Sequence, residues 1–217
     1  MVDESKPTAA AGRFQALWNR CLPIEKDADP IYDDLVSRYN ELGRCYHKQT
    51  HLAHCLQEFD KAFLLMECPD AVELALWFHD AIYVPGATDN ELRSAELFSH
   101  WGGICFTSDF VDKICKLILI TRHKQAPTGS DECYIVDIDL SSFGVNCPHF
   151  LQDSENVRKE LAFVPDATYY PAHAGFLNLL LNRPRIFYTD FFYALYEEAA
   201  RCNIKRLLSS TDYANQP

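Results

Sequence analysis

The sequence predicts an all-α fold for this chain. Only eight of its 217 residues are glycine, and its eleven prolines fall between segments whose apolar residues recur about every 3.6 positions, as on one face of a helix. Convincing stretches of the alternating apolar and polar residues that are typical of strands are absent. The length and the 48% share of hydrophobic residues suit one buried core. We therefore expect a frayed tail over residues 1–12 and a single helical bundle over 13–217.

Two pairs of polar residues mark where helices are expected to begin. Asp70 with Glu73, and Thr88 with Glu91, have the spacing of a capping box, in which two side chains satisfy free backbone amides at a helix start. In the first of these helices His79 lies on the apolar face and is expected to point inward. The expected helices cover residues 70–83, about 88–98, 109–121, 149–163, 171–182 and 190–208.

The segment over residues 134–144 fits either a strand or a helix. As a strand it would place both Asp137 and Asp139 on the solvated face. As a helix it turns these two carboxylates about 200° apart and puts Asp139 on the side of Ile135 and Leu140. The helical neighbourhood favours the helix. Asp139 would then face the core, where an unpaired carboxylate is costly and needs a strong partner.

The charge and the apolar pattern exclude several classes of partner. Twenty Lys and Arg residues against 31 Asp and Glu residues leave a net charge of −11, which argues against long nucleic acids. No stretch reaches the roughly 18 apolar residues of a transmembrane helix, and the N-terminus lacks the order of a secretory signal. We expect a cytoplasmic protein without membrane partners.

The cysteines do not suggest a disulfide framework. Nine are present, an odd number, and no two of them form a CxxC pair. Several lie within apolar runs at helical spacing. We expect most of them to be buried hydrophobic residues in a reducing compartment, although a zinc site with thiolate ligands remains an alternative that the spacing does not indicate.

Polar side chains from three separate segments are expected to face the core together. They are His51, the adjacent pair His79 and Asp80, and Asp139. A divalent cation bound by imidazole and carboxylate groups would offset the cost of burying them. Any one of these histidines alone is more often a hydrogen-bonded core residue, so it is the ordered set that favours a metal site.

His47 lies four residues before His51 and has two possible placements. His51 shares a helical face with Leu52, Cys55, Leu56, Phe59 and Phe63. If that helix extends back to His47, the two histidines lie one turn apart on the same face. If Thr50 caps the helix instead, His47 belongs to the preceding loop.

The order His51, His79, Asp80 and Asp139 resembles that of the HD superfamily of metal-dependent phosphohydrolases, an all-α fold in which four such side chains hold a divalent metal. The segment YHKQTH is similar to one in cyclic-nucleotide phosphodiesterases, whose first histidine donates a proton to the leaving oxygen and whose second binds metal. The resemblance therefore implies that His47 is the general acid. Over about residues 30–208 the pattern is also similar to a little-characterised group of HD phosphohydrolases, through RCYHKQTHL, LALWFHDAIY, TDNELRSAE, ILITRH, VDIDLSSFG and EEAARCNI.

The same resemblance bears on the choice and the number of metal ions. The segment DLS is similar to the last ligand segment of those phosphodiesterases, which favours Asp139 over Asp137. Members with two metals carry further histidines before that aspartate, where this sequence has only His100 and His123. We expect one divalent ion (manganese, iron, cobalt, nickel or zinc), with a second ion as an alternative.

Glu91 is a further catalytic candidate. HD nucleotidases usually have an acidic residue three or four positions after the HD pair, where this sequence has Tyr83 and Val84. Glu91 could take that role from the next helix, while the capping box with Thr88 is the favoured interpretation of its main role.

The implied reaction is hydrolysis of a phosphoester, from a nucleotide or another small phosphorylated metabolite. A divalent ion lowers the pKa of water, Asp80 would orient that water or take its proton, and His47 would protonate the leaving oxygen. Arg158, Arg183 and Arg185 have no metal motif beside them and are weak candidates for binding the substrate. The stronger candidates are the basic residues Arg44, Arg122, His123 and Lys124, of which the last three would otherwise form a solvated helix end. Tyr46, Trp77 and Tyr83 could stack on a base, although most aromatic residues of this kind belong to the packing of the core.

Three other interpretations of the sequence stay open. One is a degenerate enzyme that keeps the fold and the metal as a ligand sensor, and another is a metal-free helical scaffold whose histidines belong to the core. A homodimer is compatible with either. The third, an HD oxygenase with two irons, is disfavoured by the sparse histidines.

Overall fold

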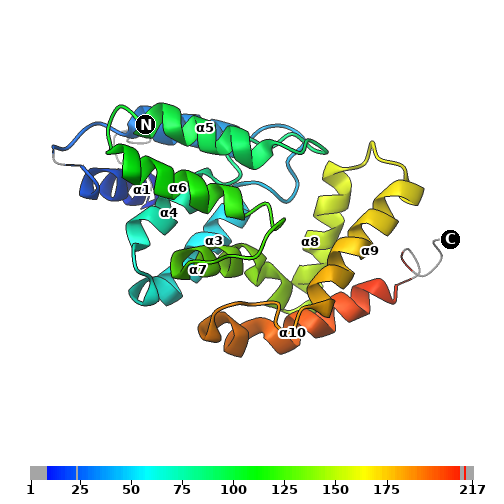
Figure 1. The fold of residues 1–217 in the computed structure, drawn as a ribbon. Coiled ribbons are helices and arrows are strands. Elements are labelled where there is room, and N and C mark those ends of the chain that lie inside the picture. Colours follow the sequence, from blue (N-terminus) through cyan, green and yellow to red (C-terminus); the bar gives the residue numbers. More distant parts are fainter. Residues whose placement is uncertain (1–8, 23, 211–212, 214–217) are drawn as a thin grey trace.

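The structure is a computed structural model that describes residues 9–22, 24–210 and 213. Every regular element in these ranges is a helix, which confirms the all-α prediction (Figure 1). The elements are α1 (Ala9–Arg20), α2 (Asp29–Tyr39), α3 (Gln49–Ala62), the 3-10 helix η1 (Phe63–Leu65), α4 (Pro69–Phe78), α5 (Asn90–Gly102), α6 (Ser108–Ile120), α7 (Ser130–Leu140), the 3-10 helix η2 (Ser141–Gly144), α8 (Cys147–Glu160), α9 (Asp166–Asn182) and α10 (Asp190–Leu208).

Helix α4 lies at the centre of the core. Every residue from Ala71 to Phe78 is buried, and the helix contacts α1, α3, α5, α6 and α7. A helix that is hydrophobic all round gains most by lying inside the bundle, where its apolar surface is removed from water. His79 and Asp80 follow α4 directly, so they start from the interior of the protein.

Helices α8, α9 and α10 lie to one side of the α1–α7 bundle (Figure 1). Helix α10 contacts η2, α8 and α9, and its buried residues include Phe192, Ala200 and Ile204. Because η2 follows α7 directly and leads into α8, it joins the two groups of helices. The end of α7, which carries Asp139, therefore lies close to this junction.

The ambiguous segment over 134–144 is helical, as predicted from its context. It forms the end of α7 followed by η2. Asp137 faces away from Asp139 and accepts hydrogen bonds from the backbone N–H groups of Tyr188 and Thr189, at 2.8 and 2.7 Å. Asp137 therefore fastens the segment before α10 to α7, which gives it a structural role of its own.

Helix α4 is shorter than the predicted helix over 70–83, and it begins differently. Its N-cap is Cys68, without a side-chain hydrogen bond. The predicted capping pair does not form, because Glu73 accepts a 2.6 Å hydrogen bond from Arg13 Nε and Asp70 accepts one from Arg20. The charged partners on α1 hold both carboxylates away from the helix start.

The second predicted capping pair, Thr88 with Glu91, is also wrong. The N-cap of α5 is Asp89, and no side chain caps the helix. Asn90 instead accepts a hydrogen bond from the N–H of Val84 at 2.9 Å and donates one to its carbonyl at 3.1 Å. These bonds hold the α4–α5 loop, and they leave Glu91 without a capping role.

The remaining boundaries differ mainly near the N-terminus. Helix α1 begins at Ala9, inside the segment expected to be a frayed tail, and Ala11 is buried; residues 1–8 lie outside the described part. Neither α1 nor α2 is among the predicted helices. Helix α9 begins five residues before its predicted start at 171 and has Pro171 inside it, in its second turn. Helix α10 has the bounds predicted for it.

All nine cysteines lie among the described residues, and each is a free thiol. Cys55 is buried and Cys202 is exposed, while the other seven are partly buried. Among the described helices, none combines the length and the apolar character needed to cross a membrane.

Candidate metal centre

Three segments bring their polar side chains together in the core. His51 lies in the first turn of α3, His79 and Asp80 directly follow α4, and Asp139 lies near the end of α7. His51 Nε2 lies 3.2 Å from Asp139 Oδ1 and 3.3 Å from His79 Nε2. Asp80 Oδ2 lies 3.1 Å from His79 Nε2 and 3.6 Å from His51 Nε2. The four residues predicted to share a metal ion therefore do converge.

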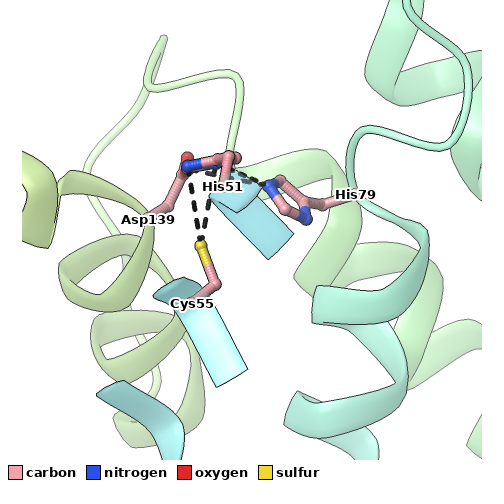
Figure 2. Close-up of side chains that lie close together, drawn as sticks. All are labelled: His51, Cys55, His79 and Asp139. Carbon is pink, nitrogen blue, oxygen red and sulfur yellow. Dashed lines mark hydrogen bonds and ion pairs between the residues drawn. The ribbon is translucent and has the colours of Figure 1, made fainter. Parts of the chain in front are cut away.

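Cys55 belongs to the same cluster. Figure 2 shows His51 interacting with Asp139, Cys55 and His79, and one donor atom from each of these four residues lies within 4.8 Å of all the others. Cys55 is one turn after His51 on α3, so the signal for its position was the i, i+4 spacing on one helix face. Burial holds the pKa of its thiol well above the ordinary value, and a neutral thiol is a weak metal ligand.

His79 is held in one orientation by the backbone. Its Nδ1 lies 2.8 Å from the carbonyl oxygen of Leu76, so the N–H at this position is the donor. Nε2 then faces the cluster, and the ring is almost fully buried. A backbone carbonyl in this position is the usual partner of a metal-binding histidine.

The charges in the cluster stabilise one another. Burial raises the pKa of Asp139, but hydrogen bonds from His123, His51 and His79 outweigh it and hold that pKa well below its usual range. Burial likewise lowers the pKa of His79, and the carboxylates of Asp80 and Asp139 outweigh it and raise that pKa well above the ordinary value. The pKa of Asp80 is lowered as well, so both carboxylates are ionised at neutral pH, as metal ligands must be, and a metal ion would have to displace the proton that they favour on His79.

His47 lies in the loop before α3, which decides between its two predicted placements. The N-cap of α3 is Lys48 rather than Thr50. His47 Nδ1 lies 2.6 Å from Glu160 Oε2, and the ring stacks on Tyr83 with centroids 4.0 Å apart. Burial lowers the pKa of His47, but the carboxylates of Asp80 and Glu160 outweigh it and raise that pKa.

Glu160 is the main residue of the site that the sequence did not indicate. Its Oε1 accepts hydrogen bonds from the backbone N–H groups of Cys45, Tyr46 and His47, at 2.7, 2.7 and 2.9 Å. The residue is buried at the end of α8, more than a hundred residues from His47 in the chain. No local pattern marks it, because the loop it serves is distant in sequence.

A cavity of about 300 Å³ lies beside the cluster, between the α1–α7 bundle and helices α8 and α9. His47, Asp80 and Asp139 line its polar side, together with Glu91 and Arg122. The predicted catalytic residues thus face the same space. Helices α8 and α9 also contribute Asp153, Ser154 and His173, and the apolar lining residues are Phe143, Phe150, Val157, Phe176, Leu177 and Leu207.

The basic residues predicted to bind substrate have different surroundings. Arg44 is buried, and its guanidinium donates to the carbonyl oxygens of Asp80 and Ala81 at 2.6 and 3.0 Å. It therefore fastens the segment after α4. Arg122 donates to the carbonyl oxygen of Thr88 at 2.9 Å and lines the cavity.

His123 and Lys124 lie near the start of the segment that joins α6 to α7. His123 Nε2 lies 2.9 Å from Asp139 Oδ2, so this histidine contacts a predicted metal ligand. Lys124 is exposed and lines a neighbouring surface cavity rather than the one beside the cluster.

The three aromatic residues predicted to contact the substrate differ in their surroundings. Tyr46 and Tyr83 line the cavity. Trp77 is buried in the core, where its ring meets Phe14 edge-on with centroids 5.2 Å apart. Its burial leaves no face for a base to stack on, so Trp77 is a packing residue and not a substrate contact.

Comparison with known proteins does not identify this chain. No family model, no curated protein and no solved structure matches it. What the site can do chemically is therefore argued from its geometry: a buried set of imidazole and carboxylate donors, a cavity beside it, and a histidine with a raised pKa on the cavity wall.

Proposed function

We propose that this protein is a metal-dependent phosphohydrolase of the HD type, acting on a small phosphoester. The observation that carries the proposal is the convergence of His51, His79, Asp80 and Asp139 beside a cavity that His47 also lines. The order of these residues resembles the HD superfamily, and their placement around one point supports that resemblance.

The donor set fits a divalent transition metal. Two imidazoles and two carboxylates suit manganese, iron, cobalt, nickel or zinc, and burying two carboxylates together favours a bound cation. His51, His79, Asp80 and Asp139 would hold the ion. With an ion that binds thiolates well, such as zinc, the Cys55 thiol would lose its proton and Cys55 would replace Asp80 as a ligand. When bound, the ion supplies a lowered pKa for water and neutralises charge on the phosphoryl oxygens.

His47 and Asp80 would move the protons. His47 lines the cavity, and its contact with Glu160 favours the protonated imidazole that a general acid needs to protonate the leaving oxygen. Asp80 has an ionised carboxylate facing the same space and would orient the attacking water or take its proton. Glu160 would act through His47 and is a positioning residue.

The cavity supports a small substrate with an apolar portion. Its volume of about 300 Å³ suits a ligand of the size of a nucleoside monophosphate. Arg122 is the cation on its wall that would meet an anionic group, and Tyr46 and Tyr83 offer faces to a base. A nucleotide is therefore the substrate class we would test first.

The test is metal analysis of the purified protein, followed by a screen of the loaded protein against nucleoside phosphates, cyclic nucleotides and simple phosphoesters. We expect nearly one equivalent of a transition metal and hydrolysis of at least one substrate. Asp139→Asn should lose both, while Asp112→Asn, at an exposed carboxylate on α6, should lose neither. Metal without turnover would favour a ligand sensor, and absence of metal would favour a helical scaffold; either result overturns the proposal.

A further inference from the structure

A second cavity, of about 520 Å³, lies next to the metal centre and shares His123 with the first cavity. It is lined by residues 123–126, which follow α6, and by the end of α9 with the segment before α10. Its wall carries the cations Lys124, Arg183 and Arg185, and no Asp or Glu is among its described lining residues. In a chain of net charge −11, this is a local concentration of positive charge.

Two of these cations have no anionic partner. Neither Lys124 nor Arg183 forms an ion pair within the part of the chain that the structure describes. Arg183 lies over the ring of Tyr188 at 5.8 Å, which holds its guanidinium at the cavity wall. Arg185 is held more firmly: it donates to the carbonyl oxygen of Thr189 at 3.3 Å, lies over the Tyr193 ring at 4.0 Å and pairs with Asp190 at 2.9 Å, although that carboxylate is 96% exposed, so solvent screens the pair.

His123, which lines both cavities, has two unusual features. Its Nδ1 is buried without a hydrogen-bond partner among the described residues, whereas most buried polar atoms in native proteins are paired. His123 also has a positive φ of 54°, a left-handed conformation that is unusual for residues other than glycine and is often found at functional sites. This conformation lets one residue contact Asp139 and line the second cavity.

We propose that this cavity binds a small anion that carries at least two phosphate groups. The cavity is larger than a single phosphate requires, and three cations from two segments could each meet a different phosphate oxygen. Because His123 belongs to both cavities, the anion is either the distal phosphate portion of the substrate or a separate effector. The first source depends on the proposed hydrolase function, whereas the binding site itself does not.

The test is calorimetric titration of the full chain with inorganic pyrophosphate, after the metal has been removed by chelation and dialysis. We expect saturable binding that weakens as salt is added. Lys124→Gln combined with Arg183→Gln should weaken it by about tenfold or more, because each removes a charge-assisted hydrogen bond. The matched control is Lys205→Gln with Arg206→Gln, which removes two exposed charges from the end of α10 and should change nothing.

Absence of saturable binding, or equal binding by the wild type and the cavity variant, would overturn the proposal. A second measurement identifies the source of the anion in the metal-loaded protein. If the cavity variant raises KM for a bisphosphorylated substrate but not for a monophosphate, the distal phosphate binds here. If pyrophosphate and substrate bind together, the anion is an effector. A protein that hydrolyses nothing would refute the hydrolase proposal and leave the pyrophosphate result standing.

Discussion

The substitution Glu160→Gln tests the role of His47 with the least change in shape. The glutamine keeps an oxygen to accept the three backbone N–H groups of the 45–47 loop, but it removes the negative charge 2.6 Å from His47 Nδ1. A hydrogen bond to a charged group contributes about 1.5–3 kcal/mol. Since about 1.4 kcal/mol corresponds to one pKa unit, the pKa of His47 should fall by about one to two units.

The expected consequence is a change in the pH profile. A general acid must be protonated, so the alkaline limb of kcat/KM should move to lower pH by the same one to two units, roughly. At pH values above the lowered pKa of His47, the variant should hydrolyse an alkyl phosphoester about tenfold to a hundredfold more slowly than the wild type does. A p-nitrophenyl ester, whose leaving group needs little protonation, should change much less. The assay is a pH–rate profile for both substrates at equal metal content.

The control is Glu155→Gln, which removes an exposed carboxylate from the same helix, α8. Superimposable profiles for Glu160→Gln and the wild type would refute the reasoning, and so would an equal loss of rate on both substrates with the metal retained.

The contact between His47 and Glu160 also affects the stability of the fold. The pKa of His47 is higher in the folded state than in the unfolded state. Its contribution to the free energy of unfolding is therefore fully present at pH values below its pKa in the unfolded state, and it is lost as pH rises through its pKa in the folded state.

Three further predictions concern the metal and the packing. His79→Ala should lose the metal, measured by elemental analysis, because it removes a buried ligand. Arg44→Ala should lower the free energy of unfolding by about 2–4 kcal/mol in urea titrations, because buried carbonyl oxygens lose a charged donor. Gly144→Ala should lower it by about 1–3 kcal/mol, because a methyl group there would overlap the side chain of Tyr196.

Matched variants separate these effects from nonspecific damage. Arg206→Ala removes an exposed guanidinium and should change the free energy of unfolding by less than about 0.5 kcal/mol. Gly12→Ala adds a methyl group in α1 where no atom lies within 4 Å, and it should not destabilise the protein. Metal bound normally by His79→Ala, or Arg44 and Gly144 variants as stable as these controls, would contradict the contacts on which the predictions rest.

Local pattern was sufficient for much of the fold and for the inward placement of several side chains of the polar cluster. The apolar period predicted α10 to the residue and α7 through its context, and it placed Asp139 and Asp137 on different sides of the helix; Asp139 faces the cluster, whereas Asp137 is buried against the segment before α10. His51 and His79 could be placed by the same reasoning, because the face of a helix on which a side chain lies depends only on its spacing from neighbouring apolar residues.

Local pattern failed where a side chain binds a group that is distant in the sequence and not the partner that its spacing predicts. Glu73 has the spacing of a capping residue, but Arg13 on α1 binds it. Arg44 looked free to meet a substrate, but the backbone carbonyls after α4 occupy its guanidinium. Such competition is decided by which groups become neighbours on folding, and spacing along the chain does not contain that information.

By itself, then, the sequence determined the helical class, the inward faces of the helices and the identity of the donors they carry, because these follow from short-range periodicity. Only the tertiary structure decided that Glu160 supports His47, that Cys55 joins the donor cluster, and that Lys124, Arg183 and Arg185 surround one cavity. These groupings join segments far apart in the chain or depend on how side chains orient, and packing of the whole bundle brings them within reach.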